Sequence, residues 1–393
     1  MVKIEDYVSK ACDFLIRDQN EDGSWSMKQE KIKEPPAPYQ NSLILTSQAL
    51  QALIFSAKKE YVDSINRAIN FCLNSELGQE QSIDLWAWKL GAIRFSETSK
   101  AIRLKKEILK LIEEKQENSG CWPYYPHTFT LTNYSICAAL PDETSEETVS
   151  KAVKWFKNAK KGKGWSKDDK DSKIEPSFTA NSILSLIRLG EQPPKEAIEY
   201  LEAEQEDNGG WRVLSDSGEW ENVTSYSTAL CVSALILANG SKEKIQKGVD
   251  YLLKCQDENG RILRNPNEKE TYHYLFYYVI QALELYSKNT DLRKFEEESK
   301  QQFLFSCYRN VLNSRALGVT EQSRIRRKDI LKALEEGDKE IAQIIDFLKK
   351  DSRYDHLNKK SHITQIKSDV EYLRSIKLIG KIRNRYYISV SLF

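Results

Sequence analysis

The sequence lacks several features that would assign the protein to a class at once. Its 393 residues include only four histidines, and no apolar run reaches the ~20 residues that a membrane-spanning helix needs. The seven cysteines form no Cys-x-x-Cys pair and fall mostly on apolar helical faces. We therefore expect reduced cysteines in the core of a cytoplasmic protein. No signal peptide is visible, because Lys3, Glu5 and Asp6 fall inside the first helical stretch.

The sequence does contain one short motif that returns at about the spacing of a helical hairpin. The motif joins a Gln to a turn with Gly and then Trp, and we expect the Gln to bond carbonyls at the end of an outer helix. The Gly supplies a left-handed turn, and the Trp folds back as an apolar plug. A repeat of fixed period decides the architecture. The copies are Gln19 to Trp25, Gln116 to Trp122 and Gln205 to Trp211, with weaker ones at Lys161 to Trp165 and Gln256 to Ile262.

Amphipathic and apolar helical stretches alternate through the first 290 residues. The amphipathic stretches mix Lys and Glu with an apolar stripe, which predicts outer helices buried on one side. The apolar stretches predict inner helices that are buried nearly all round. We therefore predict an all-α fold of six helical hairpins, an (α/α)6 toroid. The outer stretches are 4–18, 61–75, 103–116, 146–158, 194–205 and 243–256, and the inner ones are 41–57, 84–95, 130–140, 176–189, 223–238 and 271–286.

The motif resembles the QW repeat of squalene–hopene cyclases and related terpenoid cyclases. Protein prenyltransferase β subunits have a similar repeat. Both families fold as α/α toroids with paired inner and outer helices around a central cavity. The resemblance covers residues 1–290 and implies this fold, whereas fold alone does not imply an activity.

The resemblance also implies catalytic sites, and this chain departs from both. Squalene–hopene-type cyclases protonate an alkene with an Asp-x-Asp-Asp motif that is absent here, and Ser177 and Phe178 stand where the family would place carboxylates. Prenyltransferases hold zinc with Asp, Cys and His. The segment around His273 resembles their His segment, but Val223 and Ser225 occupy the other two positions. Zinc needs at least three protein ligands, so we predict no metal, no cofactor and no catalytic residue.

Aromatic residues gather on the inner stretches. In cyclases such rings line the cavity and stabilise carbocations through their π faces. Large rings also fill a wide bore, so a ligand cavity and a packed core stay open as alternatives. A cavity would take an apolar small molecule or a protein partner. Its predicted residues are Trp86, Trp88, His127, Tyr134, Phe178, Tyr226, Tyr272, His273 and Tyr277.

The C-terminal part of the chain differs from the rest in charge. Residues 323–393 hold 17 Lys and Arg against 10 Asp and Glu, a net charge of +7, which leaves −6 on the remainder. This asymmetry indicates an anionic partner for the tail. Helical stretches over 325–335, over 339–350 and from 361 onward precede two short strands around a basic turn. This order resembles a winged helix domain of bacterial transcription regulators, and a short helix over 353–359 would shift the helix labels by one.

If this domain binds double-stranded DNA, its third helix enters the major groove and its hairpin contacts the backbone. Gln365 is suited to adenine and Thr364 to a thymine methyl group, while Asp369 and Glu371 near the groove face oppose binding. A winged helix that docks on protein is the alternative. The predicted DNA-binding residues are Lys359, Lys360, Ser361, Thr364, Gln365, Lys367, Ser368, Lys381, Arg383 and Arg385.

The missing acid and zinc ligands favour a non-catalytic protein. We predict a toroid over 1–290, a connecting helix and linker over 291–320, and a winged helix over 321–393. The whole would be a cytoplasmic prokaryotic sensor, in which a ligand or partner in the toroid shifts the DNA-binding domain. One alternative is a divergent terpenoid cyclase or prenyltransferase-like enzyme acting on an isoprenoid. Another is a structural subunit of a defence or DNA-processing complex.

Overall fold

The structure is a computed structural model, and the chain divides into two compact units. The first comprises Met1–Phe95 and Arg103–Lys300, and the second comprises Ser96–Ile102 and Gln301–Phe393. Within the described residues, no helix is both long enough and apolar enough to cross a membrane. The described residues are 3–26, 38–56, 58–78, 82–96, 98–122, 130–168, 173–214, 219–288, 290–312, 321–335, 339–351, 353–354, 360–375, 379–382 and 385–388.

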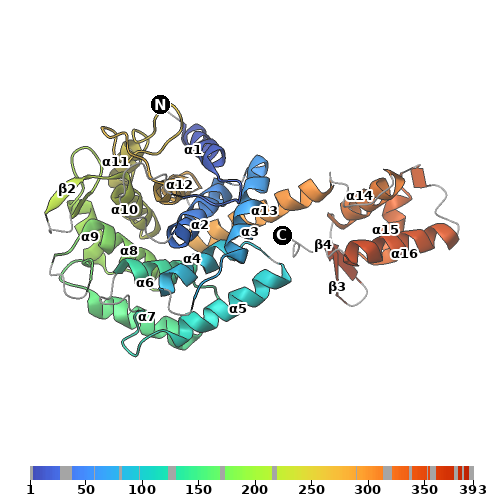
Figure 1. The fold of residues 1–393 in the computed structure, drawn as a ribbon, viewed down its shortest axis with the longest axis horizontal. Helices are drawn as coiled ribbons and strands as arrows, with labels where there is room; N and C mark the ends of the chain where they lie inside the picture. The colour runs from blue at the N-terminus through green and yellow to red at the C-terminus, as the bar shows by residue number, and fades with distance from the viewer. Residues whose placement is uncertain are drawn as a thin grey trace. The chain divides into compact units, whose positions relative to one another are not determined.

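Six inner helices form a closed ring in the first unit (Figure 1). Each packs against the next in chain order, and the last packs against the first. Their residues are buried nearly all round, as α10 shows with nine consecutive buried residues from Ser227 to Leu235. The inner helices are α2 (Pro38–Ser56), α4 (Ile83–Ile93), α6 (Thr130–Ala139), α8 (Pro176–Arg188), α10 (Ser225–Leu237) and α12 (His273–Lys288).

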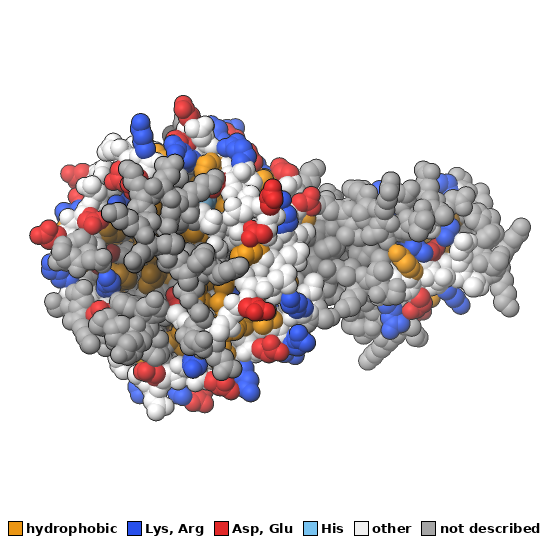
Figure 2. Space-filling model, in the orientation of Figure 1, with side chains coloured by type: hydrophobic (Ala, Val, Ile, Leu, Met, Phe, Trp, Pro, Cys, Tyr) orange, Lys and Arg blue, Asp and Glu red, His pale blue; other side chains and the backbone are white. Residues whose placement is uncertain are grey.

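Six amphipathic helices alternate with the inner ones and surround the ring, which confirms the predicted α/α toroid. Each buries one stripe and carries charged side chains on the other, so acidic and basic groups are interspersed over the visible face of the toroid (Figure 2). The outer helices are α1 (Ile4–Asp18), α3 (Val62–Asn74, after the short helix η1 over Lys59–Tyr61), α5 (Ser99–Glu114), α7 (Glu146–Ala159), α9 (Lys195–Ala203) and α11 (Lys242–Leu252).

One inner helix begins later than predicted. The prediction started it at Val223, but that residue ends a hairpin of β1 (Arg212–Leu214) and β2 (Trp220–Val223). The next residue, Thr224, is the N-cap of α10, because its hydroxyl accepts a hydrogen bond from the backbone N–H of Ser227.

The repeated motif fastens four of the outer helices, α1, α5, α9 and α11, to the outer helix that follows each of them in the ring. In the copy at Gln116, the side-chain Nε2 donates to the carbonyl of Gly120 and to that of Thr148 in α7, both at 3.0 Å. The buried Trp122 turns back and donates its Nε1 to the carbonyl of Ile112 in α5 at 2.7 Å. The predicted role of the Trp as a buried plug is confirmed, whereas the Gln bonds a carbonyl of the turn and one of the next outer helix instead of those at the end of its own helix. The same Gln bonds recur at Gln19, Gln205 and Gln256.

The glycine of the motif is required by both its conformation and its surroundings. Gly120 has φ of +95°, and a Cβ there would lie 2.0 Å from the carbonyl oxygen of Lys151 in α7. In the last copy, Gly260 approaches Lys10 of α1 in the same way, and Gln256 donates to the carbonyl of Tyr7 at 3.0 Å. The last repeat is thus bonded to the first helix, which closes the outer ring.

The second unit has a small core of its own. Helices α14 (Glu321–Glu335), α15 (Ile341–Leu348) and α16 (Lys360–Ser375) bury apolar side chains against one another. A two-stranded antiparallel hairpin follows, with β3 (Ile379–Ile382) paired to β4 (Arg385–Ile388). Helix α13 (Leu292–Leu312) contains the boundary between the units, at Lys300. The predicted tail elements are all present, although 355–359, part of the alternative short helix, lie outside the described residues.

Candidate functional site

A cavity of about 330 Å³ opens within the ring of inner helices. Its wall combines aliphatic side chains with three tyrosines and one amide. This volume falls in the ~300–1,000 Å³ range of small-molecule sites. In this part of the bore the structure therefore has a cavity. The residues that line it are Ile44, Leu45, Gln48, Leu131, Tyr226, Tyr274 and Tyr278.

The tyrosines of the wall are fixed by one another. The ring of Tyr226 in α10 meets Tyr278 edge-on at 4.8 Å between centroids and Tyr274 at 5.8 Å, with interplanar angles of 87° and 85°. Tyr274 and Tyr278 are one turn apart on α12 and so share a face. T-shaped pairs of this kind are favoured by the ring quadrupoles. The wall is therefore a rigid aromatic surface.

These phenols are neutral at physiological pH. Burial raises the pKa of Tyr274 to about 12, and it raises that of Tyr226 further above the usual 10. The negative charge of Glu175 nearby also raises the pKa of Tyr226. The hydroxyls are consequently hydrogen-bonding groups and the rings are uncharged π surfaces.

Two acidic side chains for which no role was predicted lie at the N-terminal ends of inner helices. Glu175 is the N-cap residue of α8, is only 4% exposed, and accepts a hydrogen bond from the Ser177 hydroxyl. Asp84 lies in the first turn of α4, where burial raises its pKa above the usual 3.8 although the Ser82 hydroxyl and the Leu85 N–H both donate to it. In the sequence, the position of these two acids before or at the start of an apolar helix could have indicated them as candidate functional residues.

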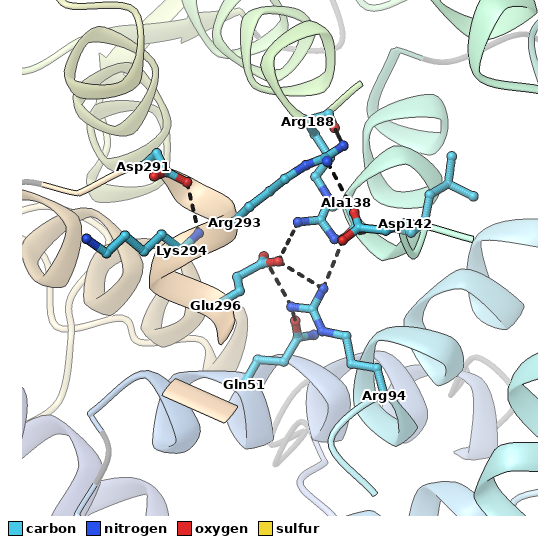
Figure 3. A network of polar contacts seen from close by, with 10 residues as sticks. Gln51, Arg94, Ala138, Asp142, Arg188, Asp291, Arg293, Lys294 and Glu296 are labelled. Atoms are coloured by element: carbon cyan, nitrogen blue, oxygen red, sulfur yellow. Dashed lines mark hydrogen bonds and ion pairs between the residues drawn. The ribbon is translucent and has the colours of Figure 1, made fainter. Parts of the chain in front are cut away.

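Deeper in the bore, the space is filled. The ring of Trp88 packs edge-on against Tyr277 at 5.7 Å, and only about 10 Å³ remains beside Tyr134 and Tyr277. At this depth Glu296 of α13 lies between two guanidinium groups: its carboxylate is 2.6 Å from Arg188 and 3.2 Å from Arg94 (Figure 3). The packed-core alternative thus describes the lower bore.

The predicted cavity residues are divided by the structure. Tyr226 lines the cavity, whereas Trp88, Tyr134 and Tyr277 belong to the filled region below it. Tyr272 stacks on Tyr274 at 5.5 Å and is the outer neighbour of the wall.

The other predicted cavity residues lie elsewhere. His273 contacts Asp18 of α1, with Nε2 2.7 Å from Oδ2, so its ring is held outside the cavity. The ring of Trp86 lies beside Lys89 on its own helix at 6.0 Å, and Phe178 is half-buried on α8. His127 lies outside the described residues. In the described part of the chain, no three His, Cys, Asp or Glu side chains converge as metal ligands.

In the second unit, Thr364, Gln365, Lys367 and Ser368 are exposed on α16. Asp369, expected near the groove face, is instead buried at 2% exposure, where its carboxylate pairs with Arg326 at 2.7 Å and Arg327 at 2.8 Å. Lys360 and Ser361 begin α16, and Lys381 and Arg385 lie in β3 and β4, with only their backbone described. Lys359 and Arg383 lie outside the described residues.

Comparison with known proteins identifies the family. Residues 97–303, more than half of the chain, match the prenyltransferase alpha-alpha toroid domain. The chain belongs to this family. A comparison with curated protein sequences finds no match.

Solved structures with the same architecture include enzymes. The type II terpene cyclase MstE from Scytonema is 13% identical, with a TM-score of 0.54, and the alignment covers 73% of this chain and 99% of the cyclase. One of its variants is solved with geranylgeranyl dihydroxybenzoate as substrate. The GH76A alpha-1,6-mannanase from Salegentibacter is 11% identical, with a TM-score of 0.53. The alignment covers 73% of this chain and 100% of the mannanase. At such identities the likeness shows the fold alone.

The prediction of a non-catalytic scaffold is wrong in the light of these neighbours. The cyclase is solved with substrate and with product, and the mannanase with an oligosaccharide, so both of these toroids are enzymes. The prediction relied on the absence of two family motifs. It overlooked buried carboxyl groups outside those motifs, such as Glu175 and Asp84.

Proposed function

We propose that this protein is a divergent terpenoid cyclase-like enzyme that binds an isoprenoid in the bore of its toroid. The observation that carries the proposal is the 330 Å³ cavity with its wall of three tyrosines and the aliphatic side chains of Ile44, Leu45 and Leu131. Such a wall removes an apolar chain from water and favours it by roughly 25 cal/mol per Å² of buried apolar surface. The substrate complex of the cyclase neighbour supports an isoprenoid as the ligand class.

The tyrosine wall suits a reaction that passes through a carbocation. A cation within ~6 Å of an aromatic ring centroid is attracted by the ring quadrupole, more strongly when it is desolvated. The high pKa values of Tyr274 and Tyr226 keep these phenols protonated, so none of them is a phenolate that would trap the cation. The mutual edge-to-face packing of Tyr226, Tyr274 and Tyr278 holds the rings in place before the substrate arrives.

We assign the role of proton donor to Glu175. Glu175 is only 4% exposed at the start of α8, and it lies near enough to the cavity residue Tyr226 to influence the pKa of that phenol. In the proposed step, the Glu175 O–H proton is transferred to a terminal alkene carbon, whose π electrons form the new C–H bond and leave a tertiary carbocation. A second alkene attacks that cation to close a ring. The final cation loses a proton, an equivalent proton returns to Glu175 through solvent, and the overall reaction is an isomerisation.

The test is conversion of linear isoprenoids by the full-length protein, with cyclic products identified by gas chromatography and mass spectrometry. Linear isoprenoids of several chain lengths are offered as substrates. We expect cyclic isomers from the wild type and a loss of at least 10²-fold in turnover for Glu175→Gln. Glu258→Gln, on an exposed carboxylate of the toroid, is the matched control and should keep full turnover. Absence of conversion of every substrate, or full turnover by Glu175→Gln, would refute this assignment.

We propose further that the second unit is a winged helix domain and that double-stranded DNA is its partner. The order of three helices and a hairpin supports this assignment, as do the exposed Thr364, Gln365, Lys367 and Ser368 on α16. Asp369 does not oppose binding, because its charge is used by Arg326 and Arg327.

Fluorescence anisotropy of the full chain with duplex DNA over a salt series tests this assignment. Lys367→Ala should lower the affinity and reduce the salt slope by about one. Lys242→Ala, on an exposed lysine of the toroid, should leave both unchanged. Binding that is absent, or insensitive to Lys367→Ala, would count against a contact through α16.

The six described cysteines are buried free thiols, which supports our proposal of a cytoplasmic location.

A further inference from the structure

The cavity wall contains an amide side chain beside its aliphatic residues and tyrosines. Gln48 of α2 lines the cavity together with Ile44 and Leu45, which lie one turn earlier on the same helix. The Gln48 side chain is only 4% exposed, and its Oε1 has no hydrogen-bond partner among the described residues. A buried carbonyl oxygen without a partner is unfavourable, because it has lost its water without gaining another donor.

The neighbouring glutamine of α2 shows what a satisfied amide looks like in this bore. Gln51, three residues further along, donates from Nε2 to the Ser47 hydroxyl at 3.2 Å and accepts from Arg94 at 3.2 Å through Oε1. Both ends of its amide are thus used by the fold. The unpartnered Oε1 of Gln48 thus contrasts with the fully used amide of Gln51 on the same helix.

A second buried amide lies across the bore on α8. Asn181 is fully buried, and neither its Oδ1 nor its Nδ2 is hydrogen-bonded to a described residue within ordinary geometry. It lies next to the hydroxyl of Tyr226, whose pKa it lowers against the larger effect of burial. Since Tyr226 lines the cavity, buried amide groups that can hydrogen-bond are present on two sides of this space, at Gln48 and beside Tyr226.

We propose that the substrate is an isoprenoid with a hydroxyl group, and that this hydroxyl donates a hydrogen bond to Oε1 of Gln48. The inference rests on the proposed isoprenoid function and narrows it from isoprenoids in general to isoprenoid alcohols or prenylated phenols. A pure hydrocarbon would fill the apolar wall but leave the Gln48 acceptor without a partner. The hydroxyl supplies the donor that the fold lacks, and the apolar chain lies against the tyrosines and aliphatic residues.

The test compares two ligands that differ only in the donor. Binding of farnesol and of farnesyl methyl ether to the full-length protein is measured by quenching of intrinsic fluorescence. We expect the wild type to bind the alcohol about tenfold more tightly, because the ether leaves the buried acceptor unpaired. In Gln48→Met, which keeps a side chain of similar length without the amide, the two ligands should bind with affinities within about twofold of each other.

Ile44→Met is the matched control on the same wall. It changes the apolar surface without removing a polar atom, so it should shift both affinities by the same factor and keep the tenfold preference. Circular dichroism of each variant verifies its fold, and the wild-type preference alone tests the proposal should Gln48→Met not fold.

The outcomes separate the two levels of inference. If the wild type binds the alcohol and the ether with equal affinity, the proposed hydrogen bond from the ligand hydroxyl is overturned. The proposed isoprenoid function is not affected by that result. If Gln48→Met keeps the tenfold preference for the alcohol, the ligand hydroxyl is bound by another residue and the assignment to Gln48 is overturned. If neither ligand binds, the proposed isoprenoid function is overturned, and with it the proposed hydrogen bond to Gln48.

Discussion

The carboxylate of Glu296 accepts a hydrogen bond from Nη1 of Arg188 at 2.6 Å, deep between the inner helices of the toroid. On its other side the carboxylate is 3.2 Å from Nη2 of Arg94. The three side chains are 10–16% exposed, so one negative charge is shared by two largely buried positive charges. Through this contact the first part of α13 is fixed to the ends of α4 and α8 (Figure 3).

Glu296→Gln should destabilise the toroid by about 3–5 kcal/mol. The substitution keeps the shape of the side chain but leaves the charges of Arg94 and Arg188 buried without a counter-charge. The free energy of unfolding in urea is the measurement. Glu298→Gln, on an exposed residue two positions along α13, should change it by no more than ~0.5 kcal/mol. Equal small effects for the two variants would mean that solvent reaches the arginines.

The same network gives the protein a defined sensitivity to acid. Burial alone would raise the pKa of Glu296, but the charges of Arg188 and Arg94 outweigh it and hold the pKa below its usual 4.5. A depressed folded-state pKa contributes stability above the unfolded-state value, and this contribution is lost as the pH falls through the folded-state value. The difference in stability between wild type and Glu296→Gln should therefore shrink as the pH is lowered below about 4.5.

Gly120→Ala should destabilise the protein more than Gly190→Ala. Both glycines have positive φ, +95° and +86°, so both variants carry the backbone strain of about 1–2 kcal/mol. A Cβ at Gly120 would also lie 2.0 Å from the Lys151 carbonyl oxygen, whereas a Cβ at Gly190 meets nothing within 4 Å. Thermal unfolding of the two variants isolates the steric part. Equal losses would show that α5 and α7 separate readily at this turn.

The repeat allowed most of the toroid to be predicted from the sequence, because each copy acts locally. The outer stretch predicted over 4–18 coincides with α1, and the Trp of the repeated turn is buried as a plug, as predicted. Patterns of period 3.6 likewise located the helices of the second unit. Local signals sufficed wherever the partner of a residue lies in the same hairpin or the next one.

The site could not be predicted equally well, because its contacts join residues far apart in sequence. Glu296 and Arg94 are separated by 202 positions, and nothing in the charged stretch around Glu296 indicates a buried partner. His273 was assigned to the cavity by resemblance, yet Asp18, 255 positions away, holds its ring elsewhere. Gln48 went unnoticed because the pattern of an apolar helix does not show which of its polar groups faces an open space.

Trp122→Ala should cost about 3–5 kcal/mol, because the ring is fully buried and its removal leaves a cavity. Trp122→Phe separates the parts of this effect. It keeps most of the apolar volume but removes the N–H that donates to the Ile112 carbonyl, so it should cost less than the alanine variant. Trp220→Ala, at a residue 41% exposed on β2, is the control for loss of an indole and should be nearly neutral. Urea unfolding that ranks the three differently would contradict the role of the Trp as a plug.

Asp84→Asn should stabilise the protein at pH 7. Burial raises the pKa of Asp84, and a raised folded-state pKa means that the protonated acid is favoured in the folded state and that stability falls as the pH rises through the pKa. An uncharged amide in the same place avoids the burial of a negative charge at neutral pH, so the melting temperature should rise there. Well below pH 3.8 both forms are neutral and the difference should vanish.

Asp63→Asn, also in the first turn of a helix but exposed, loses the same favourable interaction with the helix N-terminus and should not stabilise at pH 7. A gain in stability for Asp84→Asn but not for Asp63→Asn would show that the buried carboxylate of Asp84 destabilises the folded protein at pH 7. A loss of stability for Asp84→Asn at pH 7 would mean that the hydrogen bonds from Ser82 and Leu85 outweigh the cost of burying the carboxylate.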